Sequence, residues 1–511
     1  MSHVAKAASI LLVRGSDREL FIVRRSEELR FLGGFVAFPG GKVSPTDCEI
    51  PIDDARAGAD DGDFSLERRV AATRELFEET GVLLARRQDD TFPSSGSVLA
   101  YLRRKLLADS MTFKQVLDRL GARLCGRDLM QLGRITTPPF AAVRFDTVFY
   151  LAHLPVNQNA EIWPGELDQG RWCTPQAVVE QWTQGDCLVS PPTIAILKAL
   201  SDEPLSRTSA RLAPLFEACA GGPTPPIYFS PEVQMIPLRT QALPPTTHTN
   251  AFIVGRNPSY LIDPGPEDVE ERQCLFAAID SHHAEGGRLS AIVLTHQHPD
   301  HVGAAAICSQ KYGVPIFAHA LTARALQGNP TVQTMIESGE RLNLGQCPDG
   351  NGEWHLEAIH TPGHASGHLA FYEPRYRLLF AGDMVSTVSS VVIAPPDGDL
   401  ALYLASLRRL LSLECRLLLP GHGSPSANGR RALEASIAHR LKRENQLLAA
   451  LGPTFRSAAD LAAQLYKGLA PEMMRFAELQ IQAGLDKLRR EGRIDVSGSA
   501  AETEQFRRNR T

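Results

Sequence analysis

Paired cysteines and long apolar runs are missing from this 511-residue chain, and we expect no leader sequence. Its nine cysteines are scattered without a CxxC pair, which argues against a cysteine zinc cluster and a disulfide scaffold and fits a reducing compartment. No run approaches about 18 apolar residues, the length of a membrane span. The apolar run between Lys6 and Arg14 has only seven residues and continues into another strand-like segment, unlike a signal peptide. We therefore expect a cytoplasmic protein that does not contact a membrane.

A strong excess of charge of one sign is also missing. The net charge is −5, so the whole chain is no general binder of polyanions. Hydrophobic residues make up 43% and charged residues 22%, an ordinary composition for a folded protein. At about 100–200 residues per domain, the length predicts two to four domains.

Local composition divides the chain into parts. The segment LERRVAATRELFEET predicts a helix, and Gly81 follows it in the usual place for a helix C-cap. Strand and helix signals alternate in both halves and predict α/β and α+β domains. We expect a domain over 1–200, a linker rich in serine, proline and glycine over 201–230, a domain over 231–425, a helical or winged-helix extension over 426–496, and a disordered tail over 497–511.

Three glutamates lie on one face of the predicted helix. Glu75, Glu78 and Glu79 have i, i+3 and i+4 spacing, so their side chains are neighbours. Like charges this close repel one another unless a cation is bound, and Mg²⁺ or Mn²⁺ prefers carboxylate oxygens. The alternative is an acidic helix face exposed to solvent.

The residues around these glutamates resemble the Nudix box. The resemblance implies an α/β/α sandwich that hydrolyses a nucleoside diphosphate linked to another group, a small molecule. It also implies that Glu78 and Glu79 bind Mg²⁺ or Mn²⁺, that Glu75 is a ligand or a base, and that Arg74 orients the carboxylates. The matching residues are FPGGK (38–42), Arg74, Glu75, Leu76, Glu78, Glu79, Gly81 and Val82.

Two features depart from the Nudix pattern. A long acidic insertion separates Gly41 from Arg74, as in the coenzyme-A-type branch of the family, although no independent coenzyme A signature is found. Leu66 occupies the position of the upstream glutamate, eight residues before Arg74, and Glu67 comes one place late. The alternative is therefore a Nudix domain that senses a ligand and regulates the second half.

A second group of ligand-type residues follows a predicted buried strand in the second half. The run THQHPDH contains His296, His298, Asp300 and His301. Three later segments, TPGH, FAGD and PGHG, each place a ligand-type residue after glycine: His364, Asp383 and His422. Imidazole with carboxylate is a set that Zn²⁺ prefers, so this set predicts a metal site for Zn²⁺, with Mn²⁺ or Fe as the alternatives.

This ordered set resembles the metallo-β-lactamase superfamily. The resemblance implies an αββα sandwich and hydrolysis by a hydroxide held between two Zn²⁺ ions. It also implies that Asp300 helps to orient the hydroxide. The ligands implied for one ion are His296, His298 and His364, those for the other are Asp300, His301 and His422, and Asp383 bridges the two.

The C-terminal segment bears on the substrate of the second half. The run from His439 to Glu444, with the helices that end in LRREGRI, resembles the winged-helix extension of the β-lactamase-like protein 2 endoribonuclease group. Residues 426–511 contain 15 Lys or Arg and 10 Asp or Glu, a local charge of +5. Single-stranded RNA is therefore the first hypothesis for the substrate. The rival is a thioester or a lactone, as in glyoxalase II.

The sequence thus predicts a fusion of two metal-dependent hydrolases. It leaves open the oligomeric state and any coupling of the two activities.

Overall fold

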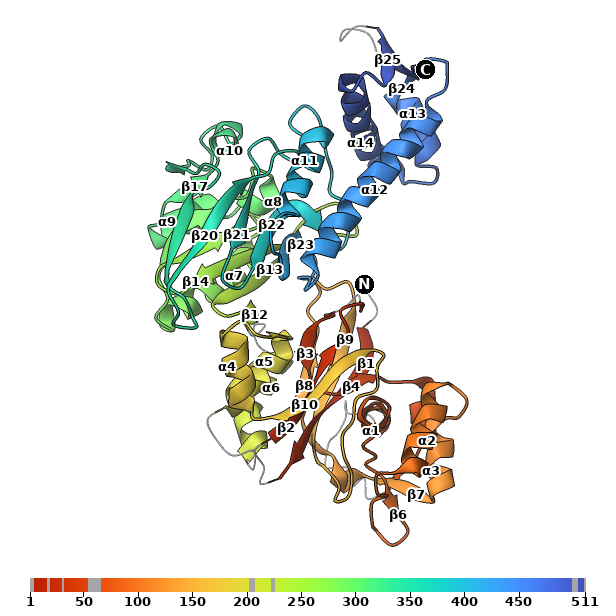
Figure 1. Cartoon of the computed structure of the whole chain (residues 1–511). Coiled ribbons are helices and arrows are strands. Elements are labelled where there is room, and N and C mark those ends of the chain that lie inside the picture. The colour runs from red at the N-terminus through yellow and green to blue at the C-terminus, as the bar shows by residue number, and fades with distance from the viewer. Residues whose placement is uncertain are drawn as a thin grey trace. The chain divides into compact units, whose positions relative to one another are not determined.

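The computed structural model describes residues 4–15, 19–29, 32–53, 66–201, 207–221, 226–498 and 504–509 (Figure 1). The chain divides into two compact units, Met1–Pro231 and Glu232–Thr511. Each unit has its own apolar cores.

The first unit is built around a mixed sheet with the strand order β11-β3-β2-β1-β9-β8. Its central strand, β1 (Val4–Arg14), is parallel to β9 (Arg144–His153) and antiparallel to β2 (Glu19–Arg25). The other strands of this sheet are β3 (Phe35–Ala37), β4 (Gly40–Lys42), β8 (Met130–Thr136), β10 (Leu167–Cys173) and β11 (Leu188–Val189).

Helices cover both faces of this sheet. Side chains alternate between the faces of a strand, so Ile10 and Leu12 pack in one core with α1 (Leu66–Thr80). Leu11 packs in the opposite core with α4 (Pro175–Thr183) and α5 (Pro191–Leu200). The predicted α/β/α sandwich is confirmed. Smaller elements complete the unit: η1 (Pro45–Glu49), β5 (Ile52–Asp53), β6 (Arg86–Arg87), α2 (Ser97–Leu107), α3 (Phe113–Leu120), β7 (Ala122–Cys125) and η2 (Gly126–Asp128).

The segment expected to be a linker contains regular structure in its described part. Residues 201–230 include α6 (Thr208–Gly221) and β12 (Ile227–Ser230). Leu212 and Phe216 are buried, and the Phe216 ring lies 5.9 Å from the ring of Phe149. The expectation of a linker is wrong here because a few apolar residues at helical spacing outweigh the surrounding serine, proline and glycine.

The second unit contains two sheets that face each other. Phe252 of the first sheet meets Phe380 of the second edge to face, with ring centroids 5.3 Å apart. In order across the first sheet, the strands of this unit are β13 (Val233–Arg239), β14 (His248–Gly255), β15 (Ser259–Ile262), β16 (Leu289–Val293), β17 (Ile316–Ala318) and β18 (Thr334–Met335). The second sheet contains, in order, β19 (Arg341–Gln346), β20 (Glu353–His360), β21 (Leu369–Glu373), β22 (Leu378–Ser386) and β23 (Leu417–His422).

Helices cover the outer faces of both sheets. α7 (Val269–Ala284) and α9 (Ala305–Tyr312) share an apolar core with the first sheet. α11 (Leu400–Leu410) and α12 (Gly429–Ala450) share one with the second. The predicted αββα sandwich is confirmed. Two short helices, α8 (Pro299–Val302) and α10 (Ala320–Ala325), lie in the loops.

The C-terminal part of the second unit is a small winged-helix domain. Its elements are α13 (Ala458–Leu465), α14 (Pro471–Arg490) and the strands β24 (Arg456–Ser457), β25 (Ile494–Ser497) and β26 (Gln505–Arg508). The expectation of a disordered tail over 497–511 is wrong for Gln505–Arg508, which pairs with β24 and β25. The reason is Phe506, which is fully buried in the core of this domain.

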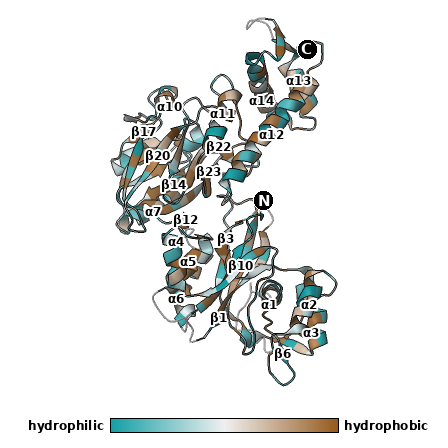
Figure 2. Ribbon diagram, in the orientation of Figure 1, coloured by the Kyte–Doolittle hydropathy of each residue, from teal (hydrophilic) through white to brown (hydrophobic). Residues whose placement is uncertain are grey.

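The two strands that lead to candidate ligands are strongly apolar. Figure 2 shows the hydrophobic colour on β22 and β23, which are almost entirely buried. Asp383 lies in β22, and His422 is the last residue of β23. Because a buried strand is rigid, it holds these two side chains in fixed positions. No helix in the described ranges is long and apolar enough to cross a membrane.

Candidate metal centres

The acidic face of α1 is held against β4. The N–H of Gly40 donates to Glu79 Oε2 over 2.8 Å. A Cβ atom on Gly41 would lie 2.3 Å from the Glu75 carboxyl carbon, so a side chain there would collide with this carboxylate. The glycines of FPGGK therefore let a strand approach the carboxylates closely.

Burial makes these carboxylates resist ionisation. It raises the pKa of Glu75 to about 7, and it also raises the pKa of Glu78 and, more strongly, that of Glu79. Arg74 Nη1 lies 3.0 Å from both Glu75 Oε1 and Glu78 Oε2. One guanidinium contacts two of the three half-buried glutamates, so a divalent cation with oxygen ligands fits this group.

The acid that holds Arg74 is Asp47. Its carboxylate accepts from Arg74 Nε at 2.8 Å and from Nη2 at 3.0 Å, and only 1% of Asp47 is exposed. Leu66 is exposed, and Glu67 pairs with Lys6 instead. The upstream acid of the Nudix pattern was sought by counting back from Arg74, which missed Asp47 because the insertion lies between the two residues. Counting forward from Gly41, before the insertion, would have identified Asp47.

We expect Asp47→Ala to lower the stability of the first unit by about 3–5 kcal/mol, because it removes one partner of a buried ion pair. Nudix hydrolysis should fall more than tenfold, since Arg74 would no longer be fixed beside Glu75 and Glu78. Urea unfolding and initial rates measure the two effects. Glu67→Ala is the matched control, and its more exposed pair should contribute less than about 1 kcal/mol. Equal losses in the two variants would contradict this role for Asp47.

Arg103 of α2 caps the end of α1 that carries the glutamates. Its Nε donates to the carbonyl of Glu78 at 3.0 Å, and its Nη2 donates to that of Glu79 at 2.7 Å. The guanidinium also lies 4.2 Å from the ring of Trp163, and burial lowers the pKa of Arg103 to about 10. No local pattern in the sequence pointed to this contact, because the partners come from different helices.

Three histidines converge after β16 in the second unit. His298 Nδ1 lies 2.9 Å from His296 Nε2 and 2.9 Å from His364 Nε2. Burial lowers the pKa of His298 to about 4 and that of His296 well below its usual value, so both rings are neutral near pH 7. Converging neutral ring nitrogens are a donor set for a cation such as Zn²⁺.

A second set adjoins the first through Asp383. His422 Nε2 lies 3.4 Å from Asp300 Oδ2 and 3.3 Å from Asp383 Oδ1, and His301 Nε2 lies 3.4 Å from the same Asp383 oxygen. The other oxygen, Oδ2, lies 3.5 Å from His364 Nε2. Within the described chain, the buried atoms His301 Nε2 and Asp383 Oδ1 have no hydrogen-bond partner. Such unpaired buried atoms fit ligands of a cation.

Hydrogen bonds with residues outside the two ligand sets orient the candidate ligands. His301 Nδ1 donates to Asp263 Oδ2 at 2.9 Å, which leaves Nε2 free to bind a cation. His422 Nδ1 donates to the carbonyl of His248 at 2.9 Å. His368 is fully buried, accepts the N–H of Asp383 at 3.1 Å and contacts Thr361, so it helps to hold Asp383 in place. Sequence reasoning missed Asp263, because its contact with His301 depends on tertiary packing.

The structure brings together all the ligand candidates predicted for the second half. Three groups have ligand atoms within 4.8 Å of one another: His296, His298 and His364; His296, His301 and Asp383; and Asp300, His301 and His422. In the first half, Arg74 joins Glu75 and Glu78, while Glu79 contacts Gly40.

Family models match three parts of the chain. Residues 244–422 match the metallo-beta-lactamase superfamily, residues 55–200 match the NUDT19 Nudix domain, and residues 457–502 match the beta-lactamase associated winged helix domain. The beta-lactamase-like protein 2 homolog of Drosophila melanogaster is 30% identical over 266 residues, which are 50% of this chain and 86% of that protein. The chain belongs to the β-lactamase-like protein 2 family. Its first half adds a Nudix domain to this family's architecture.

Other relatives match one half each. The putative nudix hydrolase 7 of Caenorhabditis elegans is 29% identical over 195 residues, which are 38% of this chain and 60% of that protein. The atrochrysone carboxyl ACP thioesterase of Aspergillus fumigatus is 31% identical over 211 residues, which are 40% of this chain and 59% of that protein. The chain thus spans about three fifths of the length of these curated relatives.

A solved metallo-β-lactamase family protein from Thermus thermophilus is 25% identical, with a TM-score of 0.45, and the match covers 55% of this chain and all of that one. The Nudix and metallo-β-lactamase domains, with the hydrolase names of their relatives, support a hydrolase that uses divalent metal.

Proposed function

We propose that the His/Asp centre hydrolyses an acyl thioester and that the Nudix half hydrolyses a small diphosphate compound. The observation that carries the first part is a pocket of about 700 Å³ at the His/Asp centre. His298, Asp300, Asp383 and His422 line one end of it. A volume of this size suits a small molecule.

Many apolar side chains line the rest of the pocket, beside a polar wall. Leu243, Pro244 and Val391 contribute from the catalytic domain. This arrangement suits a substrate whose scissile carbonyl adjoins an apolar acyl group, and the thioesterase among the relatives agrees with it. The larger apolar side chains from α12, α13, α14 and the segment joining them are Leu447, Leu465, Leu469, Met473, Phe476 and Ile481.

The ligand sets fit two Zn²⁺ ions, one held by His296, His298 and His364 and the other by Asp300, His301 and His422, with Asp383 shared. Bound there, the ions would polarise the carbonyl and lower the pKa of water. Asp300 Oδ2 accepts from the Thr249 hydroxyl at 3.0 Å, which fixes the carboxylate. We assign to Asp300 the orientation of the attacking water.

Hydrolysis of single-stranded RNA is the second candidate. The observation that favours it is the local charge of +5 over residues 426–511. Against it, Arg440 is not presented to solvent: it is 8% exposed and donates to Gln480 and to the carbonyl of Val391.

The test compares the two substrates on the full chain loaded with Zn²⁺. We expect release of thiol from a butyryl thioester, followed with a thiol reagent, and no cleavage of a labelled RNA oligonucleotide. The variant Asp300→Asn should lose this thiol release. Cleavage of RNA without release of thiol would overturn the proposal.

The Nudix half offers an unused cation beside its glutamates. Among the described residues, the side chain of Arg25 makes no hydrogen bond or ion pair, and its Nε is buried. Its charge lowers the pKa of Glu79 against the effect of burial. Arg24, by contrast, donates twice to Asp168, at 2.8 Å each. Arg25 is therefore free to bind a phosphate of the substrate, of which coenzyme A is one candidate, while Mg²⁺ or Mn²⁺ binds the glutamates.

We expect Arg25→Met to raise the KM for a diphosphate substrate at least tenfold, because a guanidinium–phosphate contact is lost. Steady-state rates with coenzyme A and with ADP-ribose in Mg²⁺ measure this. Arg24→Met removes the same charge from the neighbouring position and is the control, with little change in KM. An unchanged KM in Arg25→Met would show that Arg25 does not bind the substrate.

A further inference from the structure

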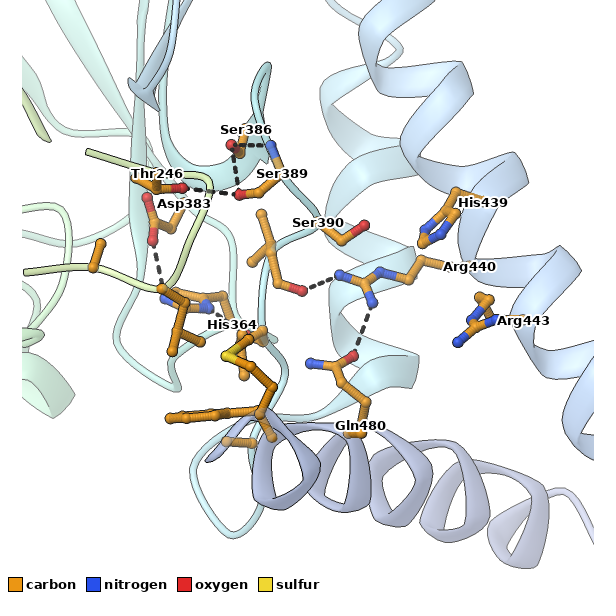
Figure 3. Close-up of a pocket in the computed structure, with 18 of the residues that line it drawn as sticks. Thr246, His364, Asp383, Ser386, Ser389, Ser390, His439, Arg440, Arg443 and Gln480 are labelled. Atoms are coloured by element: carbon orange, nitrogen blue, oxygen red, sulfur yellow. Dashed lines mark hydrogen bonds and ion pairs between the residues drawn. The ribbon is translucent and has the colours of Figure 1, made fainter. Parts of the chain in front are cut away.

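One face of α12 forms a wall of the pocket at the His/Asp centre. His439, Arg440, Arg443 and Leu447 line the pocket, with the spacing of one helical face. Figure 3 shows His439, Arg440 and Arg443 on one side of the pocket and His364 and Asp383 on the other. Lys442 is exposed and does not line the pocket.

The two arginines have no carboxylate partner among the described residues. Arg440 donates to Gln480 and to the carbonyl of Val391. Arg443 donates to Gln446 at 2.9 Å and lies 4.2 Å from the ring of Tyr466. This wall therefore carries two positive charges that no described acid neutralises directly.

The acids of this pocket outside the His/Asp centre are already engaged. Glu444 accepts from Lys487 at 2.6 Å and from Arg493 at 2.7 Å. Asp397 accepts from Gln297 at 2.6 Å and from the N–H of Ser366. Burial lowers the pKa of His439, and the charges of Arg440, Arg443 and Lys442 lower it further, as expected where positive charge is in excess.

An unused donor lies beside these charges. Gln480 Oε1 accepts from Arg440 Nη1 at 2.9 Å, which orients the amide. Its Nε2 is buried and has no hydrogen-bond partner in the described part of the chain. A buried donor without a partner is costly unless a ligand satisfies it.

We propose that Arg440, Arg443 and Gln480 form an anion-binding subsite, so that the preferred thioester carries a carboxylate or a phosphate away from its scissile carbonyl. This inference rests on the proposed function. The anion could belong to the acyl group, as a terminal carboxylate, or to the thiol, as a phosphate. Arg440 also holds Val391, so Arg443 is the better position for a test.

The test uses three thioesters on the full chain loaded with Zn²⁺. They are a neutral butyryl thioester of N-acetylcysteamine, the glutaryl thioester of the same thiol, and the butyryl thioester of 4′-phosphopantetheine. We expect kcat/KM to be at least tenfold higher for one anionic substrate than for the neutral one, and the preferred substrate identifies the source of the anion. Arg443→Met should lose most of this preference through KM, with a much smaller change in kcat/KM for the neutral substrate. Lys442→Met, which removes the same charge one position away, should keep it.

The outcomes separate the subsite from the proposed function. Hydrolysis of all three thioesters without a preference for charge, or an equal loss in Arg443→Met and Lys442→Met, would overturn the subsite and leave the function standing. If no thioester is hydrolysed, the function fails, and calorimetric titration with inorganic phosphate and with glutarate tests the subsite directly. Weaker binding in Arg443→Met alone would support it, and equal binding in all three proteins would overturn it.

Discussion

Replacing Asp383 by alanine is expected to abolish hydrolysis at the His/Asp centre, with a loss of at least a thousandfold. The Asp383 oxygens lie 3.3 Å from His422 Nε2 and 3.5 Å from His364 Nε2, so this carboxylate connects the two ligand sets. Without it, at least one cation should be lost. Turnover and metal content per chain, from elemental analysis, measure the two effects.

The Nudix half provides an internal control for this variant. Its diphosphate hydrolysis in Mg²⁺ should be unchanged, because Asp383 belongs to the other compact unit. Asp280→Ala removes an exposed acid of α7 and should keep both activities and full metal content. Normal turnover with full metal in Asp383→Ala would show that Asp383 is not a shared ligand.

The ligand candidates could be predicted because each lies in a short segment with its own signal. His296, His298 and His301 follow one strand, and Asp383 follows a glycine near the end of another. Their outer partners could not be predicted in the same way. Asp263 reaches His301 across 38 positions of the chain, and Arg103 reaches Glu78 across 25. Such contacts depend on tertiary packing, which leaves no local pattern.

The errors at the linker and the tail have a common physical cause. Composition averages over many residues, whereas one large apolar side chain can fix a short segment. Phe216 fixes α6 against Phe149, and Phe506 fixes β26 in the core of the winged-helix domain. In the described parts of both segments, burial of a few apolar side chains, among them Phe216 and Phe506, stabilises the regular structure.

The sequence shows that the C-terminal segment is basic, but it does not show toward which side of α12 the basic side chains point. Arg440 and Arg443 lie on the pocket side of α12, whereas Lys442 between them is exposed. The rotation of the helix about its axis decides which charges a substrate meets. A count of charges therefore suggests a surface for RNA, whereas the fold places two of these charges inside a pocket.

We expect Glu79→Gln to reduce Mg²⁺-dependent diphosphate hydrolysis by about two to four orders of magnitude without loss of stability. Glutamine keeps the shape of the side chain and removes the charge that a hard cation needs. Stability should be kept or slightly increased, because burial, with the neighbouring charge of Glu75, already raises the pKa of Glu79 well above its usual value.

Initial rates with a diphosphate substrate and thermal unfolding of the full chain measure the two effects of Glu79→Gln. Glu67→Gln is the control, because Glu67 lies on the same helix but forms an ion pair with Lys6 and does not belong to the group of three glutamates. The rate of this variant should stay close to that of the wild type. Thiol release at the His/Asp centre should be the same in both variants. A wild-type rate in Glu79→Gln would contradict this role for the acidic face of α1. A carboxylate that can be neutralised without loss of turnover does not bind the catalytic metal.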